Sequence, residues 1–288
     1  FGLYPWDQVP ALPPEVILLP AWLPINLYEI SYWSRTILIP LSVVYGLRPS
    51  WVGAPFSVDE LWVDPVRKRA RITNFQKGGR GWRIFFLTMN RLLKWHEAFR
   101  WKPLRARALR AADQWITQRL METDGLGAIF PAMVNAVFAL KALGYGDGDP
   151  LFERSVRELE RLELEDGPDL KVQPCFSPVW DTALAVYVLG RAAGFERARQ
   201  PALERALAWL EQNEIRIWGD WWIKNRRARP GGWAFQFRNP FYPDVDDTAQ
   251  VLLAMEACRG PEKARTMGAF QRGLSWILSM QNRDGGWS

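Results

Sequence analysis

The chain has 288 residues, long enough to bury a substantial core and to hold parts of two domains. A formal net charge of +6 permits an anionic surface as a partner, but acidic and apolar residues interleave heavily and no nucleic-acid-binding motif is present, so nucleic acid is not an expected partner. Seventeen tryptophans far exceed ordinary usage, and Cys175 and Cys258 give neither a disulfide framework nor the spacing of a metal site.

The first half of the chain is apolar but contains no predicted transmembrane helix. Its longest apolar stretches, residues 16–30 and 37–47, are interrupted by prolines and a glutamate. A spanning helix needs about 20 consecutive apolar residues, which neither stretch supplies. The chain opens on Phe1 rather than on methionine and stops at Ser288 inside a tryptophan-rich motif, so we expect it to be a section of a longer protein.

Residues 82–96 predict an amphipathic helix that follows a glycine-rich run at 78–81. One narrow helical stripe gathers apolar residues and the only histidine, namely Trp82, Phe85, Phe86, Met89, Leu92, Leu93 and His96. Basic and polar residues lie roughly opposite this stripe. A basic helix with Trp and Phe can lie in the membrane interface, whereas the periodicity alone is equally compatible with a helix that faces a protein core.

Helical periodicity dominates from about residue 80 onward. The further helices expected from it are 105–118, 134–143, 151–164, 182–193, 201–212, 248–258 and 264–280. Glycine and proline clusters separate these segments, and no run alternates for long enough to predict a major sheet. The fold class expected from the pattern is therefore all-α.

An internal repeat with a period of about 66 residues runs through the second half of the chain. The repeated pairs are Asp-Thr-Ala at 181–183 and 247–249, Trp-apolar at 209–210 and 276–277, and Gly-x-Trp at 219–221 and 285–287. Helix pairs repeated in this way stack into a solenoid or close into an α/α toroid with a central cavity. In the last unit, Gln281 is expected to bond backbone groups at a helix end beneath Trp287, which is a structural role.

Residues 244–247 place three aspartates within four positions, directly after an aromatic run at 233–242. Carboxylates this close repel one another when all are ionised, so the pKa of at least one of these aspartates is expected to rise. A carboxyl group that keeps its proton among aromatic side chains suits a reaction that starts by protonating a weakly basic group. Three carboxylates are also more than helix capping requires, although Asp247 is expected to contribute to the cap. The cluster therefore predicts an acid catalyst for an apolar substrate.

Five motifs together resemble one known family. They lie at residues 26–35 (NLYEISYWSR), 176–183 (FSPVWDTA), 231–237 (GGWAFQF), 244–249 (DVDDTA) and 281–287 (QNRDGGW). The combination resembles the squalene-hopene cyclases, which are bacterial triterpene cyclases, from near residue 3 to the end of the chain. The resemblance implies a double α/α barrel, with residues 1–172 in the inserted second barrel and residues 173–288 in the catalytic barrel.

The resemblance also implies a role for each aspartate. Asp246 corresponds to the proton donor, and Asp244 and Asp247 polarise or anchor it. Enzymes of this family protonate a terminal double bond of squalene and fold the chain through carbocations to hopene, or to a hopanol when water captures the last cation. A histidine further along the family's sequence, beyond Ser288, assists the acid. A bound cation would hold the carboxylates ionised, so neither a metal nor a cofactor is expected.

Carbocations need stabilisation by groups that do not trap them, and aromatic faces supply about 2 kcal/mol each when desolvated. The resemblance implies this role for Trp33, Trp180 and Phe235; for other tryptophans, packing is the expected role. Phe130 and Asn135 stand where some family members carry glutamine and an aromatic residue, so no function is transferred to them.

The family carries its membrane-contacting helix in the region of residues 82–96, which favours the membrane interpretation there. The implied contact residues are Trp82, Phe85, Phe86 and Met89. The resemblance further implies a monotopic protein at the cytoplasmic face of the bacterial cell membrane, squalene as the small-molecule partner, and a possible homodimer.

Three alternatives stay open. A cyclase of the same chemistry could act on another polyprenyl chain, such as a diterpene precursor or a curcumene, and cavity length would separate it from a squalene cyclase. A non-catalytic lipid-binding toroid is disfavoured by the intact aspartates. An α/α-toroid glycosidase would need two carboxylates flanking a polar cleft, which the aromatic surroundings of Asp246 disfavour. The central expectation is that Asp246 keeps its proton in a dry, aromatic-lined hollow.

Overall fold

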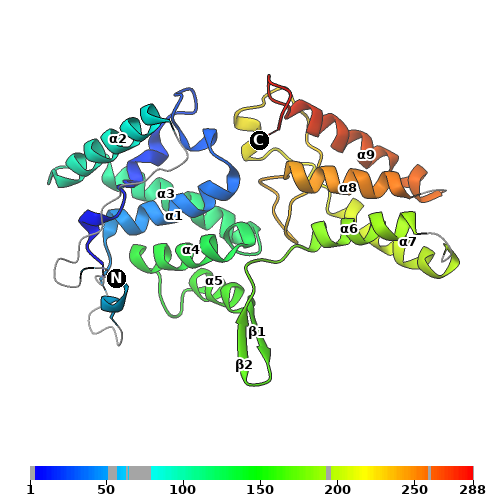
Figure 1. Cartoon of the computed structure of the whole chain (residues 1–288), viewed down its shortest axis with the longest axis horizontal. Coiled ribbons are helices and arrows are strands. Elements are labelled where there is room, and N and C mark those ends of the chain that lie inside the picture. The colour runs from blue at the N-terminus through cyan, green and yellow to red at the C-terminus, as the bar shows by residue number, and fades with distance from the viewer. Residues whose placement is uncertain are drawn as a thin grey trace.

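The computed structural model describes residues 4–50, 57–62, 64, 79–192, 196–258 and 261–287. They form two helical lobes that lie side by side in Figure 1. The first lobe holds α1 (Tyr32–Leu47), α2 (Arg80–Ala98), α3 (Arg105–Glu122), α4 (Phe130–Leu143) and α5 (Pro150–Glu160). The second holds α6 (Pro178–Arg191), α7 (Glu196–Gln212), α8 (Val245–Ala257) and α9 (Pro261–Ser279).

Each lobe packs around its own apolar core. In the first lobe, α1 lies along α4, and the buried side chains include Ile39, Val43, Ile116 and Leu140. In the second lobe, α6 lies along α8 with α7 and α9 outside them. Its buried side chains include Val186, Leu207, Val251, Met255 and Trp233. Burial of each such side chain stabilises the fold by about 1.5–3 kcal/mol relative to exposure.

The predicted helix 151–164 is too long. Helix α5 ends at Glu160, and an antiparallel hairpin follows, with β1 (Glu163–Asp166) paired to β2 (Asp169–Val172). The Asp-Gly pair at 166–167 is a hairpin signal, and Gly167 adopts the positive φ of 65° that the turn requires. The hairpin projects from the first lobe, and the residues of both strands are exposed.

The loop after α9 closes on itself, but the contact of Gln281 differs from the one that the repeat predicts. Gln281 donates a hydrogen bond from Nε2 to the Gly285 carbonyl at 2.7 Å, so it bonds its own loop rather than a helix end. The Trp287 indole donates to the Ile277 carbonyl in the last turn of α9 at 2.7 Å. Both residues therefore have a structural role, because their side-chain N–H groups donate hydrogen bonds to backbone carbonyls.

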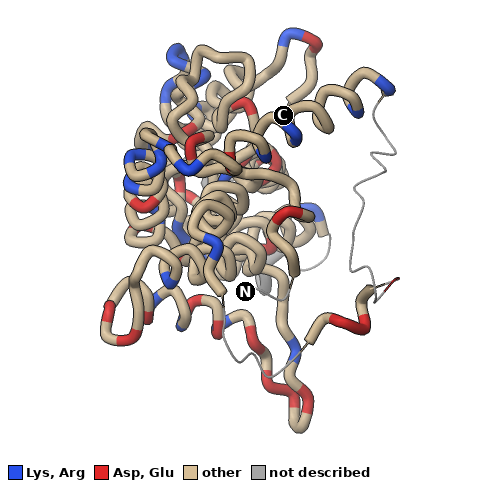
Figure 2. Tube along the Cα trace, turned by 90° about the vertical axis from the view of Figure 1, so that its left-hand side faces the viewer, with Lys and Arg blue, Asp and Glu red and all other residues tan. Residues whose placement is uncertain are grey.

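Charge is distributed over both lobes. Figure 2 shows Lys and Arg interleaved with Asp and Glu, and the hairpin, lowest in both views, is mainly acidic. Helix α2 stands at the edge of the first lobe (Figures 1 and 2). Among the described helices, none has the length and apolarity needed to cross a bilayer.

Candidate active site

The amino terminus of α8 is fixed by a buried tryptophan. The backbone of Trp233 pairs with Asp244, whose N–H donates to the Trp233 carbonyl at 2.8 Å. The Trp233 N–H donates to the Thr248 hydroxyl at 3.0 Å, and its indole donates to the Leu210 carbonyl at 2.6 Å. Trp233 is fully buried. The three aspartates are therefore held on a rigid support rather than on a free loop.

Asp244 is the residue that caps α8. Its Oδ1 accepts a hydrogen bond from the Asp246 N–H at 2.8 Å, which satisfies one of the free donors of the first turn. Its Oδ2 accepts a bond from the Trp33 indole in α1 at 3.2 Å. The expectation that Asp247 contributes to the cap is wrong, since Asp244 precedes the first helical turn and Asp247 points into the protein.

Asp247 is the carboxyl that retains a proton. Its side chain is buried, with 2% of its surface exposed, and its Oδ1 has no hydrogen-bond partner within the described residues. Burial, followed by the charges of Asp244 and Asp246, raises the pKa of Asp247 to about 8. Burial also raises the pKa of Asp244, although hydrogen bonds from the Asp246 backbone and from Trp33 offset part of that rise. The predicted upward shift in the crowded cluster is confirmed.

Asp246 occupies a different environment from the one predicted. Its side chain is exposed, so the expectation that it lies in a dry hollow is wrong for the described residues. The reason is its position on α8, whose buried stripe runs through Asp247, Thr248, Val251 and Met255. Asp246 lies beside this stripe and is one of the residues that line a pocket.

The pocket brings together all six residues predicted for acid catalysis and cation stabilisation. It has a volume of about 340 Å³ and is lined by Trp33, Trp180, Phe235, Asp244, Asp246, Asp247, Ile129 and Cys175. Phe235 meets Trp33 edge to face, with ring centroids 5.6 Å apart and planes at 88°. Residues from both lobes thus surround one space in which carboxyl groups meet aromatic rings.

Two residues of the lining were missed in the sequence. Ile129 and Cys175 form an isolated antiparallel bridge between the lobes, and a single pair of bridging residues leaves no periodic signal. Burial raises the pKa of the Cys175 thiol and so disfavours the thiolate.

Comparisons with known proteins agree with this architecture. The family model described as the squalene-hopene cyclase N-terminal domain matches residues 1–167, and the squalene-hopene cyclase C-terminal domain matches residues 176–288. The chain belongs to the squalene-hopene cyclase family. The resemblance found in the sequence and the all-α fold of the terpene cyclase type are confirmed.

Squalene-hopene cyclase relatives match the whole chain but are much longer. A squalene–hopene cyclase of Zymomonas mobilis is 38% identical over 301 residues, which cover 100% of this chain and 44% of that protein. One of Bradyrhizobium diazoefficiens is 37% identical over 291 residues with the same coverage. Dammaradiene synthase of Dryopteris crassirhizoma is 36% identical over 288 residues, which cover 100% of this chain and 42% of that protein. The chain therefore spans less than half the length of these relatives.

Helix α2, where squalene-hopene cyclases were expected to contact the membrane, is attached to the first lobe by polar groups. Asn90 accepts a bond from the Ala11 N–H at 2.9 Å, and Lys94 donates to the Asp7 carbonyl at 2.5 Å. Trp82 and Phe86 are exposed, whereas Phe85 and Met89 are half-buried. Further exposed apolar residues on the helix are Ile84, Leu92 and Trp95, of which only Leu92 was placed on the predicted stripe. The exposed apolar surface is thus broader than that stripe.

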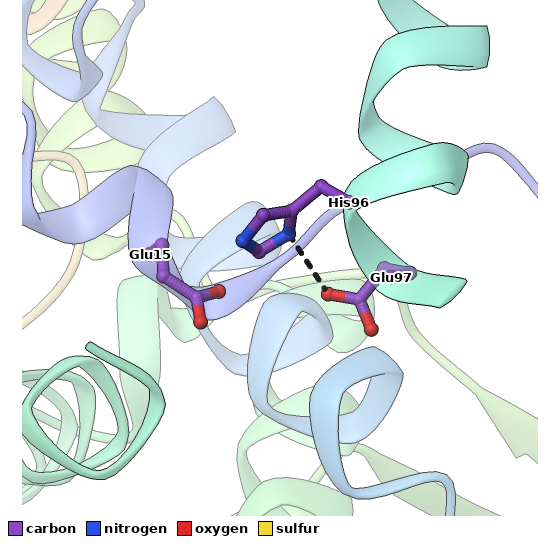
Figure 3. A group of neighbouring side chains, drawn as sticks. All are labelled: Glu15, His96 and Glu97. Carbon is purple, nitrogen blue, oxygen red and sulfur yellow. Dashed lines mark ion pairs between the residues drawn. The ribbon is translucent and has the colours of Figure 1, made fainter. Parts of the chain in front are cut away.

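The end of α2 joins a cluster of ionisable side chains, Glu15, His96 and Glu97 (Figure 3). His96 Nδ1 lies 3.7 Å from Glu97. Arg105 donates to both carboxylates, at 2.8 Å to Glu15, and Lys102 lies 3.3 Å from Glu97. A metal ion would have to displace these cations, so the donor set fits an ion-pair network that ties α2 to α3 rather than a metal centre.

Proposed function

We propose that this protein is a triterpene cyclase that protonates a terminal alkene of squalene and guides the resulting carbocation through successive ring closures. The observation that carries the proposal is that three aspartates line the same pocket as Trp33, Trp180 and Phe235. The acid cluster retains a proton near neutral pH because burial raises the pKa of Asp247 to about 8. An alkene is a very weak base, so its protonation requires a protonated carboxyl group beside an apolar surface.

In the first step the π electrons of the alkene form a C–H bond with a proton of the acid cluster, delivered through Asp246 as the family resemblance implies, while the O–H bond of the carboxyl group breaks. A carboxylate and a tertiary carbocation result. Asp244 is a less favourable donor, because hydrogen bonds from the Asp246 N–H and from Trp33 stabilise its ionised form. The substrate itself would cover the exposed Asp246 when its apolar end fills the pocket, and the excluded water would strengthen the electrostatics there.

The cation then needs stabilisation without capture. Trp33, Trp180 and Phe235 line the same pocket and present ring systems to it, which attract a nearby cation through their quadrupoles. Proton loss from the last cation returns a proton to solution and gives hopene, so the sequence of steps consumes no cofactor. Addition of water to that cation would give a hopanol instead.

The length of the substrate is a further part of the proposal. A pocket of about 340 Å³ lies at the small end of ligand sites, which span about 300–1,000 Å³. It accommodates one end of a polyprenyl chain, where the chemistry begins. The names of the Zymomonas and Bradyrhizobium relatives support squalene as the substrate and hopene as the product. The name of the dammaradiene synthase gives a different product. A shorter polyprenyl substrate is the alternative.

The proposal is tested by incubating the intact protein with squalene in detergent micelles and analysing the hydrocarbon fraction by gas chromatography and mass spectrometry. A cyclic isomer of squalene, or its hydrate, is the expected product. If a shorter polyprenyl substrate is converted and squalene is not, the shorter chain is the substrate of this protein. If neither is converted, the proposal is overturned.

We further propose that the protein is monotopic and enters the membrane interface through α2. Polar anchoring through Asn90 and Lys94 leaves Trp82 and Phe86 exposed, with Arg83 and Arg91 available for anionic headgroups. The substrate is a membrane hydrocarbon, so this location would bring the protein to it.

Replacing Trp82 and Phe86 together with serine is expected to weaken binding to phosphatidylglycerol vesicles at least tenfold. The two rings are 62% and 48% exposed and both contact Phe85 of the same helix, so their loss removes exposed apolar surface from α2. Vesicle co-sedimentation measures the partition. The matched control replaces Leu170 and Val172 of the hairpin with serine; these are 61% and 52% exposed and should not change binding. Equal binding of wild type and the α2 variant would contradict the membrane role.

A further inference from the structure

The first turn of α1 makes three neighbouring contacts with the second lobe. Tyr32 stacks on Tyr242, with ring centroids 4.8 Å apart and planes at 9°. Trp33 donates its indole hydrogen bond to Asp244 at 3.2 Å. One turn of helix therefore carries an interlobe contact and, directly beside it, the tryptophan that touches the acid cluster.

The third contact is an ion-pair group that the proposed chemistry does not use. Asp220 of the second lobe lies between two arginines of the first, which we call the Asp220 cluster (Arg35, Arg119 and Asp220). Arg119 donates to Asp220 Oδ1 at 2.5 Å, and Arg35 lies 3.8 Å from Oδ2. The side chains are 4%, 5% and 7% exposed for Arg35, Arg119 and Asp220, so water screens their charges little.

Aromatic rings enclose the two guanidinium groups. The rings are Tyr28, Tyr32 and Tyr242 around Arg35, and Trp115 and Phe241 around Arg119. Arg35 also donates to the Ile30 carbonyl at 2.7 Å. Each guanidinium is therefore held by ring contacts together with directed hydrogen bonds, from Arg35 to the Ile30 carbonyl and from Arg119 to Asp220 and the Trp115 carbonyl, while the Nε of each arginine has no hydrogen-bond partner within the described residues.

Asp220 is coupled to the loop that carries the catalytic aspartates. Its N–H donates to the Phe241 carbonyl at 2.9 Å. The loops approach so closely at Gly219 that a Cβ there would lie 1.9 Å from the Phe241 carbonyl oxygen, so only glycine fits. A displacement of Asp220 would thus displace residues 241–244 with it.

We propose that Arg35, Arg119 and Asp220 are positioning residues that hold the Trp33 indole against Asp244 and so set the geometry of the acid cluster for catalysis. Arg35 lies two positions after Trp33, and Asp220 is bonded to the loop that ends at Asp244, so the cluster fixes both partners of that hydrogen bond. A shift of about 1 Å in such a site can cost a hundredfold in rate. The role in catalysis rests on the proposed function, but the geometric role does not.

The test replaces Asp220 with asparagine in the intact protein, which keeps the size of the side chain and removes its charge. We expect kcat for squalene to fall tenfold to a hundredfold with KM changed less than threefold. In fluorotryptophan-labelled protein, the ¹⁹F resonance of Trp33, assigned through Trp33→Phe, is expected to move. Lys224→Gln is the matched control, since it removes an exposed ion pair with Glu29 between the same two lobes. It should leave rate and resonance unchanged.

A solely structural role would lower the melting temperature while leaving kcat at 25 °C and the Trp33 resonance as in the wild type, and that result would overturn the proposal. If Asp220→Asn does not fold, Arg119→Lys is measured against the same criteria, because it keeps the charge and loses the planar donors. Absence of cyclic product from the wild type would refute the proposed function alone. The Trp33 resonance would then still decide the positioning role.

Discussion

Replacing Asp246 with asparagine is expected to lower the cyclisation rate by about a thousandfold or more. General acid catalysis contributes about 10²–10⁴ in rate, and an amide cannot supply the proton. The fold should be unaffected, because the side chain is exposed and the backbone N–H of residue 246 still donates to Asp244. Initial rates with squalene, together with the circular dichroism spectrum, measure both parts of the expectation.

The matched control for this variant is Asp149→Asn. Asp149 is also an aspartate at a helix amino terminus, where it caps α5 through the backbone N–H groups of Leu151 and Phe152. Asparagine caps helices about as well as aspartate, so activity and stability should both persist. An Asp246→Asn protein that retained wild-type activity would refute Asp246 as the proton donor.

Replacing Asp247 with asparagine is expected to change the pH dependence of stability and to lower activity. The pKa of Asp247 is about 8 in the folded protein and about 4 in an unfolded chain. Between these values the folded state binds the extra proton, so the free energy of unfolding of the wild type falls as pH rises, by at most about 1.4 kcal/mol per pH unit. Asparagine removes this titration. The variant should therefore gain stability relative to the wild type between about pH 4 and pH 8.

Urea unfolding of both proteins at pH 5, 6, 7 and 8 measures this difference. We expect the advantage of the variant to grow steadily across the series and to level off above pH 8. Activity should fall at least tenfold, because the cluster loses the carboxyl that retains a proton near neutral pH. A constant difference in stability from pH 5 to pH 8 would contradict the raised pKa of Asp247.

Helices in the sequence were predictable because their apolar faces have a local period. Seven expected segments correspond to α3 to α9, but α1 was not expected as a helix, and at 161–164 helical periodicity concealed an Asp-Gly hairpin. At 161–164 the helical period of the apolar residues and the Asp-Gly turn signal predict different structures, and the chain adopts the turn. The candidate residues of the pocket were predictable in kind because the aspartates, Trp180 and Phe235 lie in dense motifs.

The arrangement of the site was not predictable from local patterns. Trp33 and Asp244 are 211 positions apart, and nothing in either segment shows that they share a hydrogen bond. The burial of Asp247 and the exposure of Asp246 follow from which face of α8 meets the core, which the spacing of three aspartates does not specify. Ile129 and the Asp220 cluster depend on how the two lobes meet, so they became visible only in the structure.

The most direct test of the account is the cyclisation of squalene by the intact protein in D₂O. If the acid cluster supplies the first proton, each hopene molecule gains one deuterium, located in the first ring at the carbon that was the CH of the terminal alkene. Mass spectrometry and ²H NMR of the product determine both the number and the position. A cyclic product without deuterium at that carbon would contradict protonation by the aspartates as the initiating step.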